Sequence, residues 1–233
     1  MNANASNLPA LGAHTILIDV DETITHTRDE SFLEHVLRDV VATVHGVDEN
    51  EARRRIASVC DPQHEDVEPH LPELGIDPGR YDEALADAAR PFVSPYSDAV
   101  AMIRTLHDDG FALYPATTNG RCVILAKMAA AGLTDDSGCP HFKELFGGSQ
   151  VEPAGKSGPA FYHALLRRIG AAPDEVVMVG DNPQADLAFA QSAGIHQVVL
   201  PRRDQPDPWV VESDGGIYVK SLALVPQMVT LRS

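Results

Sequence analysis

The stretch "ILIDVDETIT", residues 16–25, decides the fold because it joins a buried strand to a group of carboxylates. Residues 16–18 are an unbroken run of branched aliphatic side chains, typical of a strand buried on both faces of a parallel sheet. Asp19, Asp21 and Glu22 follow at once, so three carboxylates fall within four residues. Like charges at this spacing repel one another, and the pattern therefore predicts a positive group among them.

Composition limits the classes of partner. The 233 residues, 44% hydrophobic and 22% charged, suit one large domain or one domain carrying an insertion. A net charge of -16 repels nucleic-acid backbones and anionic membranes, so we expect neither as a partner. An anionic small substrate then needs local positive charge from a lysine, a helix N-terminus or a metal ion.

The cysteines and the first residues bear on the compartment. Cys60, Cys122 and Cys139 are odd in number and form no CxxC pair, which argues against a disulfide framework or a structural zinc site. Residues 1–15 have neither a basic patch nor an apolar core, so we expect no signal peptide. No apolar run approaches membrane-spanning length. We therefore expect a soluble, cytoplasmic protein.

Residues 25–94 show helical periodicity. Thr27 and Glu30 have the spacing of a capping box, and an apolar stripe follows them. Asp48 opens a second helix by the same signal, and a third is expected near residues 80–90. We predict a small helical unit without strands, packed around its own core.

From Pro95 onward, apolar strands alternate with amphipathic helices, which predicts a parallel sheet with helices on both faces. Pro115 cannot donate a hydrogen bond inside a strand, so that strand either bulges there or ends early. The prediction is a Rossmann-like core of residues 1–24 and 95–233 with an α-helical cap, residues 25–94, inserted after the first strand. The expected strands are 111–117, 175–180 and 196–200, and the expected helices are 95–110, 121–132, 159–170 and 183–194.

Polar residues follow three of these strands. Ligands of such folds collect at the carboxyl ends of the strands, so these residues should meet at one edge. They are Asp19, Asp21 and Thr23 after the first strand, Thr117, Thr118 and Asn119 after the second, and Gly180, Asp181 and Asn182 after the third.

Four motifs in one order give these residues a family resemblance. They are DxDxT (Asp19, Asp21, Thr23), Thr118 with Asn119, Lys156 opening a helix, and GDxxxxD (Gly180, Asp181, Asp186). This set resembles the haloacid dehalogenase (HAD) superfamily of aspartate-nucleophile hydrolases over residues 14–225 or so. The resemblance implies an HAD-like core and a cap inserted after the first motif. It also implies phosphate transfer through an aspartyl-phosphate.

The resemblance implies roles for the paired aspartates. Asp19 would be the nucleophile and a metal ligand. Side chains alternate along an extended chain, so Asp21 projects to the same side and can protonate the leaving group and later activate water. Asp21 is also expected at the metal. The resemblance also implies a phosphatase or phosphotransferase, because family members with aspartate at this position have these activities, whereas those cleaving carbon–halogen or carbon–phosphorus bonds have other residues there.

The other motifs are expected to bind phosphate and metal. Lys156 offers a point charge to phosphoryl oxygens. Thr118 and Asn119 begin a helix, where free N–H groups suit a phosphate, although Thr117 could be the binding residue instead of Thr118. Asp181 should complete a Mg²⁺ site with Asp19 and Asp21, since Mg²⁺ prefers oxygen ligands. Residues expected to surround these groups are Asp186, Thr23 and Asn182, the last as a helix N-cap before Pro183.

Two departures from the family pattern and one cap residue complete the site prediction. Glu22 stands where glycine is commonest, which should stiffen the turn into the cap, and Ser157 replaces the proline that usually follows the lysine. Arg28, at the start of the cap, is the cap cation expected to reach a substrate, although it can equally be a solvated charge at a helix end.

These observations predict a Mg²⁺-dependent phosphatase acting on a small phosphorylated metabolite, of the phosphosugar or nucleoside monophosphate class. Two alternatives stay open. A phosphotransferase or sugar-phosphate mutase would pass the phosphoryl group to another hydroxyl, and a phosphate-sensing regulatory domain would bind without turnover. The sequence does not identify the substrate, because cap residues select it.

Overall fold

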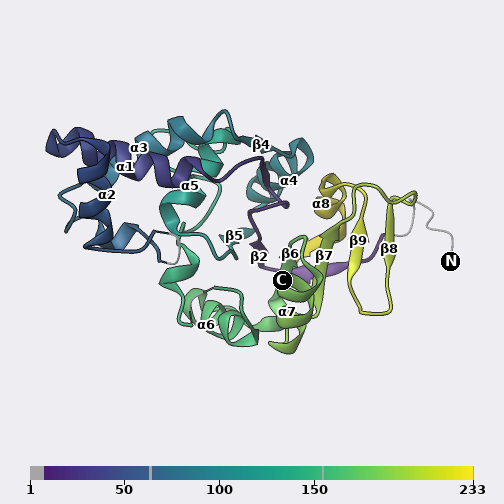
Figure 1. Cartoon of the computed structure of the whole chain (residues 1–233). Coiled ribbons are helices and arrows are strands. Elements are labelled where there is room, and N and C mark those ends of the chain that lie inside the picture. Colours follow the sequence, from purple (N-terminus) through teal and green to yellow (C-terminus); the bar gives the residue numbers. More distant parts are fainter. Residues whose placement is uncertain (1–7, 63–64, 154, 233) are drawn as a thin grey trace.

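The computed structural model describes residues 8–62, 65–153 and 155–232 (Figure 1). The remaining residues, which the predicted core and cap ranges include, lie outside the described part. The strands are β1 (Leu11–Ala13), β2 (Thr15–Ile18), β3 (Thr25–Thr27), β4 (Val93–Pro95), β5 (Ala112–Pro115), β6 (Val176–Val179), β7 (Gln197–Pro201), β8 (Trp209–Val211), β9 (Ile217–Val219) and β10 (Val229–Leu231). The helices are α1 (Phe32–His45), α2 (Glu49–Ala57), α3 (Pro78–Ala89), α4 (Ser97–Asp108), α5 (Arg121–Ala130), α6 (Pro159–Ile169), α7 (Phe189–Ser192) and α8 (Val225–Met228).

The main sheet has six strands in the order β5-β2-β6-β7-β9-β8. Its neighbours are parallel except for β8, which runs antiparallel to β9. Figure 1 shows helices on both faces of this sheet, and the predicted Rossmann-like α/β fold is confirmed. None of the described helices combines the length and the apolarity that crossing a lipid bilayer requires.

The first strand is buried on both faces, as its aliphatic run predicts. Ile16 and Ile18 pack in one hydrophobic cluster, which includes residues of α4, α5 and α8. Leu17 points the other way into a second cluster with residues of α6 and α7. All three side chains are fully buried. Because β2 is buried on both faces, the residue that follows it, Asp19, is held in a fixed position.

Three strands end level with one another, and this register builds the site. Ile18 at the end of β2 pairs with Pro115 of β5 on one side and with Val179 of β6 on the other. The segments after these strands therefore leave the sheet side by side, as predicted. Pro115 is the last residue of β5, so this strand ends early and the missing N–H donor breaks no interior ladder.

The segment between β2 and α4 corrects two predictions. It is not free of strands, because β3 and β4 pair antiparallel, with Thr25 opposite Pro95. Thr27 is a β3 residue, so the predicted capping box with Glu30 is wrong, and α1 begins at Phe32 after Ser31. The capping-box prediction failed because the pairing of β3 with β4 overrides the local capping signal. The second capping signal is confirmed.

In that second signal, the side chain of Asp48 accepts a hydrogen bond from the Glu51 N–H at the start of α2. Helices α1, α2 and α3 bury their apolar faces in a third hydrophobic cluster. This cluster also contains Cys122 and Ala126 of α5. Figure 1 shows the three helices grouped at one end of the molecule with α5 beside them. Their core is therefore shared with a helix that follows the second strand of the sheet.

Candidate active site

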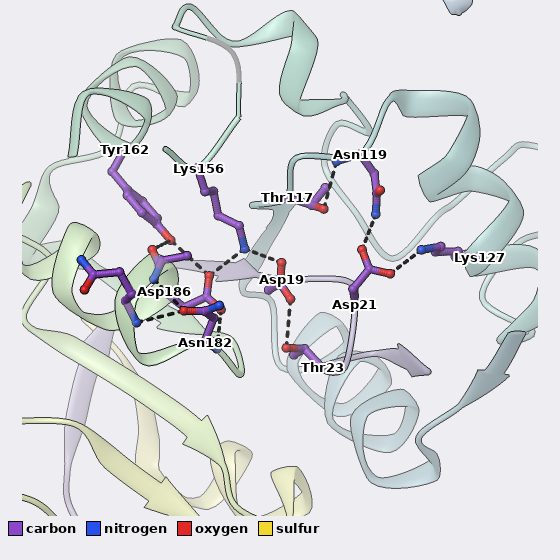
Figure 2. A network of polar contacts seen from close by, with 12 residues as sticks. Asp19, Asp21, Thr23, Thr117, Asn119, Lys127, Lys156, Tyr162, Asn182 and Asp186 are labelled. Atoms are coloured by element: carbon purple, nitrogen blue, oxygen red, sulfur yellow. Dashed lines mark hydrogen bonds and ion pairs between the residues drawn. The ribbon is translucent and has the colours of Figure 1, made fainter. Parts of the chain in front are cut away.

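Asp19 lies at the centre of the polar contacts in Figure 2. The backbone N–H of Asp19 donates to the carbonyl of Val179 at 2.9 Å, which continues the β2–β6 pairing to this residue. Asp19 is 5% exposed, and its Oδ2 accepts a hydrogen bond from Thr23 Oγ1 at 3.2 Å. Its Oδ1 accepts from Nζ of Lys156. The carboxylate is thus oriented by two donors, and a positive group lies beside it as the sequence predicts.

Lys156 joins Asp19 to a second buried carboxylate. Its Nζ lies 2.7 Å from Oδ1 of Asp186, whose side chain has no exposed surface. Asp186 also accepts hydrogen bonds from Tyr162 Oη at 3.4 Å and from the Asn182 N–H at 3.0 Å. Burial lowers the pKa of Lys156, but the charges of Asp19 and Asp186 outweigh burial and raise it. The lysine therefore stays an ammonium in this site.

The turn after β6 shapes the position of Asp186. Asn182 is the N-cap of the following helix, with its side-chain oxygen accepting from the N–H groups of Gln184 and Ala185, as its sequence position predicts. The first part of that helix, Pro183–Ala188, is a π-helix. A Cβ at Gly180 would lie 2.4 Å from the Asp186 side chain. The glycine of GDxxxxD therefore leaves room for this buried carboxylate, because any side chain at position 180 would collide with it.

Three carboxylates of this edge lie close enough to share a cation. Oxygens of Asp19, Asp181 and Asp186 all lie within 4.8 Å of one another. Burial raises the pKa of Asp19 to about 7, with Asp186 adding to the effect and Lys156 opposing it. Burial, and then Asp186, raise the pKa of Asp181 to about 6. Clustered carboxylates that resist ionisation, with oxygen atoms as the donors, fit a hard divalent cation such as Mg²⁺.

Asp21 turns toward a different side of the site. Figure 2 shows its carboxylate directed to Asn119 and Lys127, whereas Asp19 faces Lys156 and Thr23. Nδ2 of Asn119 donates to Oδ2 of Asp21 at 2.5 Å, and Nζ of Lys127 donates to Oδ1. Among the described residues, two groups of side chains could hold a metal, Asp19 with Asp181 and Asp186, and Asp66 with Glu68 and Cys122, and neither includes the Asp21 carboxylate.

Sequence reasoning did not single out Lys127. A signal was present, because Lys127 interrupts the apolar run of the helix "RCVILAKMAA". A charge inside such a run predicts either an exposed helix face or a buried ion pair. Periodicity alone does not distinguish these, and the structure shows the ion pair.

The two threonines after β5 differ in exposure. Thr117 is 2% exposed, and its Oγ1 accepts a hydrogen bond from the Asn119 N–H at 3.2 Å. Thr118 is exposed and lines a cavity of about 450 Å³ together with Asn119 and Gly120. The opposite wall comes from the helical unit, including Leu33 and Tyr81 of α1 and α3. Thr118 thus faces free space, whereas Thr117 serves the local turn.

Two side chains at the entrance to the helical unit have other partners. Arg28 donates to the Pro91 carbonyl at 3.0 Å, and the residues lining the 450 Å³ cavity do not include it. Glu22 has a φ of 54°, in the left-handed region that glycine adopts most easily. Its carboxylate accepts from Tyr96 Oη at 2.8 Å and contacts His26 Nδ1 at 2.7 Å. These two contacts of the Glu22 side chain stabilise the turn.

Comparison with known proteins gives a consistent result. The pyrophosphatase PpaX of Halalkalibacterium halodurans is 25% identical over 221 residues, covering 90% of this chain and 93% of that protein. The glyceraldehyde 3-phosphate phosphatase of Methanopyrus kandleri is 26% identical over 207 residues, covering 82% and 85%. The crystal structure of a HAD phosphatase from Thermococcus onnurineus superposes with a TM-score of 0.56 at 23% identity, covering 92% of this chain and 96% of that one.

A family model described as haloacid dehalogenase-like hydrolase matches residues 13–194. The match includes all four motifs and the segment between β2 and α4. Together with the fold, it confirms the resemblance drawn from the motifs. The chain is a hydrolase and belongs to the haloacid dehalogenase-like family.

Proposed function

We propose that this protein is a Mg²⁺-dependent phosphatase that hydrolyses a small phosphorylated metabolite through an aspartyl-phosphate. The observation that carries the proposal is the buried carboxylate of Asp19, oriented by Thr23 and Lys156 beside the other acidic groups. A carboxylate whose orientation is fixed by two hydrogen-bond donors is suited to act as a nucleophile. The ammonium of Lys156 beside it attracts the phosphoryl oxygens of a substrate.

The proposed reaction has two displacements at phosphorus. First, an Asp19 oxygen attacks phosphorus, the ester P–O bond breaks, and Asp21 gives its proton to the departing oxygen. Second, water attacks the aspartyl-phosphate while Asp21 takes a proton from that water. The bond between the Asp19 oxygen and phosphorus then breaks, which releases phosphate, restores the Asp19 carboxylate and leaves Asp21 protonated for the next turnover. Thr118 and Asn119 would hold the phosphoryl group at the start of α5.

In this proposal Asp19 and Asp181 would hold a Mg²⁺ ion, and Asp186 would remain the ion-pair partner of Lys156. When bound, the ion supplies positive charge that neutralises repulsion between the carboxylate and the phosphate. The sequence prediction also assigned Asp21 to the metal. Its carboxylate points to Asn119 and Lys127 instead, so we assign proton transfer to that group.

The size of the cavity supports a small substrate. Its volume of about 450 Å³ is in the range of sites for small molecules. Helices α1 and α3 form one wall, so a substrate bound at Thr118 would be covered by the helical unit. The relatives named a pyrophosphatase and a glyceraldehyde 3-phosphate phosphatase support the same class. We propose that the substrate is a phosphosugar or a nucleoside monophosphate. We also propose a cytoplasmic location, which the free, buried thiols of Cys60 and Cys122 support.

The test is a screen of phosphorylated metabolites for phosphate release with Mg²⁺ and with EDTA. Release that requires Mg²⁺ and disappears in Asp19→Asn supports the proposal. Mass spectrometry of enzyme quenched in acid during turnover should show one added phosphoryl group at Asp19. Formation of a bisphosphorylated sugar instead of phosphate would show a mutase. Metabolite binding without turnover would show a sensing domain, and either result would overturn the proposal.

A further inference from the structure

Lys127 of α5 is a buried ammonium group near the site. Its side chain has no exposed surface. Lysine is almost never fully buried unless it is paired. Its Nζ donates to Oδ1 of Asp21 and, at 3.2 Å, to Oε1 of Glu30. The burial is therefore tied to two carboxylates, one of which belongs to the DxDxT motif.

The two partners come from different segments. Asp21 follows β2 of the sheet, and Glu30 lies between β3 and α1, where the chain enters the helical unit. Lys127 itself lies on α5, and its neighbour Ala126 packs in the hydrophobic cluster of α1, α2 and α3. The Lys127 ammonium thus links three parts of the chain: the segment after β2, the segment between β3 and α1, and helix α5, on which the helical unit packs.

This contact completes the orientation of the Asp21 carboxylate. Lys127 holds one oxygen and Asn119 holds the other, the latter at 2.5 Å. Asn119 also lines the 450 Å³ cavity, so the Asp21 carboxylate is hydrogen-bonded to a residue of the cavity wall. A group that transfers a proton must stay within hydrogen-bond reach of the atom that receives it. A free aspartate side chain would instead populate several rotamers.

We propose that Lys127, held in place by Glu30, is a positioning residue that orients the carboxyl group of Asp21 for its proton transfers with the leaving group and the attacking water. It acts through Asp21 and does not touch the substrate. The proposal rests on the proposed phosphatase function. It predicts that loss of Lys127 harms reactions that need a proton far more than reactions that do not.

The experiment compares two substrates of the intact protein in Mg²⁺. One is p-nitrophenyl phosphate, whose leaving group departs without a proton, and the other is the best alkyl phosphate from the metabolite screen. For Lys127→Met, we expect kcat on the alkyl phosphate to fall about tenfold or more relative to kcat on the aryl phosphate, a part of the ~10²–10⁴-fold that general acid–base catalysis supplies. Glu30→Gln should lower the same ratio by a smaller factor.

The control is Lys143→Met, which removes the same charge from an exposed position and should leave the ratio unchanged. In an Asp21→Asn background, Lys127→Met should no longer change the ratio, because the group that it orients is gone. If the Lys127→Met variant does not fold, the double variant Lys127→Met/Glu30→Gln is used instead, because it removes both charges of the Lys127–Glu30 ion pair.

The results separate the possibilities. A selective fall in the ratio that vanishes without Asp21 supports the positioning role. Equal losses on both substrates, no loss, or a ratio change that persists in Asp21→Asn would overturn it and leave the phosphatase proposal standing. Failure of the unaltered protein to hydrolyse either ester would instead refute the phosphatase proposal itself.

Discussion

The ammonium of Lys156 lies 2.7 Å from Oδ1 of Asp186 and also donates to Oδ1 of Asp19. One cation therefore neutralises two buried carboxylates, one directly after β2 and one in the helix that follows β6. Asp181 completes the acidic group without an ion pair to Lys156 among the described contacts. A divalent cation would balance this excess of negative charge.

Asp19→Asn should abolish turnover and keep the fold. Asparagine has nearly the same shape, but it is a far poorer nucleophile and metal ligand, so we expect at least a ~100-fold loss of kcat. Steady-state kinetics on the best substrate measure the loss, and circular dichroism checks the fold. Activity above about a hundredth of that of the unaltered protein would exclude Asp19 as the nucleophile.

Asp21→Asn should slow substrates according to their leaving groups. Alkyl phosphates need a proton on the departing oxygen, so their hydrolysis should fall by ~10²–10⁴-fold, whereas p-nitrophenyl phosphate should lose much less. Plotting kcat against the pKa of the leaving alcohol or phenol measures this dependence. Parallel losses along the whole series would contradict the assignment of proton transfer to Asp21.

Lys156→Met should destabilise the metal-free protein. The Lys156 and Asp19 side chains are each 7% exposed, so removal of the ammonium leaves buried carboxylates without their cation. Breaking a buried ion pair in this way costs ~3–5 kcal/mol. Urea unfolding at pH 8 in EDTA measures the change, and Mg²⁺ should recover part of it. Lys220→Met, at an exposed position, is the control, and an equal effect of both variants would refute the prediction.

Stability of the metal-free protein should fall as pH rises. Burial raises the pKa of Asp19 from 3.8 to about 7 and that of Asp181 to about 6, so both bind a proton more tightly in the folded protein. Their favourable contribution is then present below pH 3.8 and is lost as the pH rises through the folded-state values. Urea unfolding in EDTA across this range measures the free energy of unfolding. Asp19→Asn should flatten the profile and be the more stable protein at pH 8, and an unchanged slope would contradict this.

Substrate size should limit the enzyme. The cavity at Thr118 is closed on one side by helices α1 and α3, so a small phosphate ester fits where a folded protein surface does not. We expect efficient hydrolysis of a small metabolite and negligible release of phosphate from folded phosphoproteins. Malachite green assays on both kinds of substrate make the comparison. Dephosphorylation of a folded phosphoprotein at the rate of the best small substrate would refute the prediction.

Much of the fold follows from local patterns. The aliphatic run of residues 16–18 predicts a doubly buried strand, and all three side chains are fully buried. Asn182 before Pro183 predicts a helix start, and the N-cap hydrogen bonds are present. These predictions succeed because strand burial and helix capping depend on residues close together in the chain. The capping box at Thr27 failed for the converse reason, since its partner strand β4 lies far along the chain.

The sequence by itself determined the family, the α/β class and the order in which the motif residues meet the strand ends. Only the tertiary structure decided which cation faces which carboxylate. Lys156 was predicted near Asp19, but the ion pair of Lys127 with Asp21 joins residues 106 positions apart in the chain. Likewise, α5 completes the core of the helical unit through Cys122 and Ala126. Periodicity reports which face of a helix is apolar, but not which distant segment covers that face. The partner is set by the packing of the whole chain.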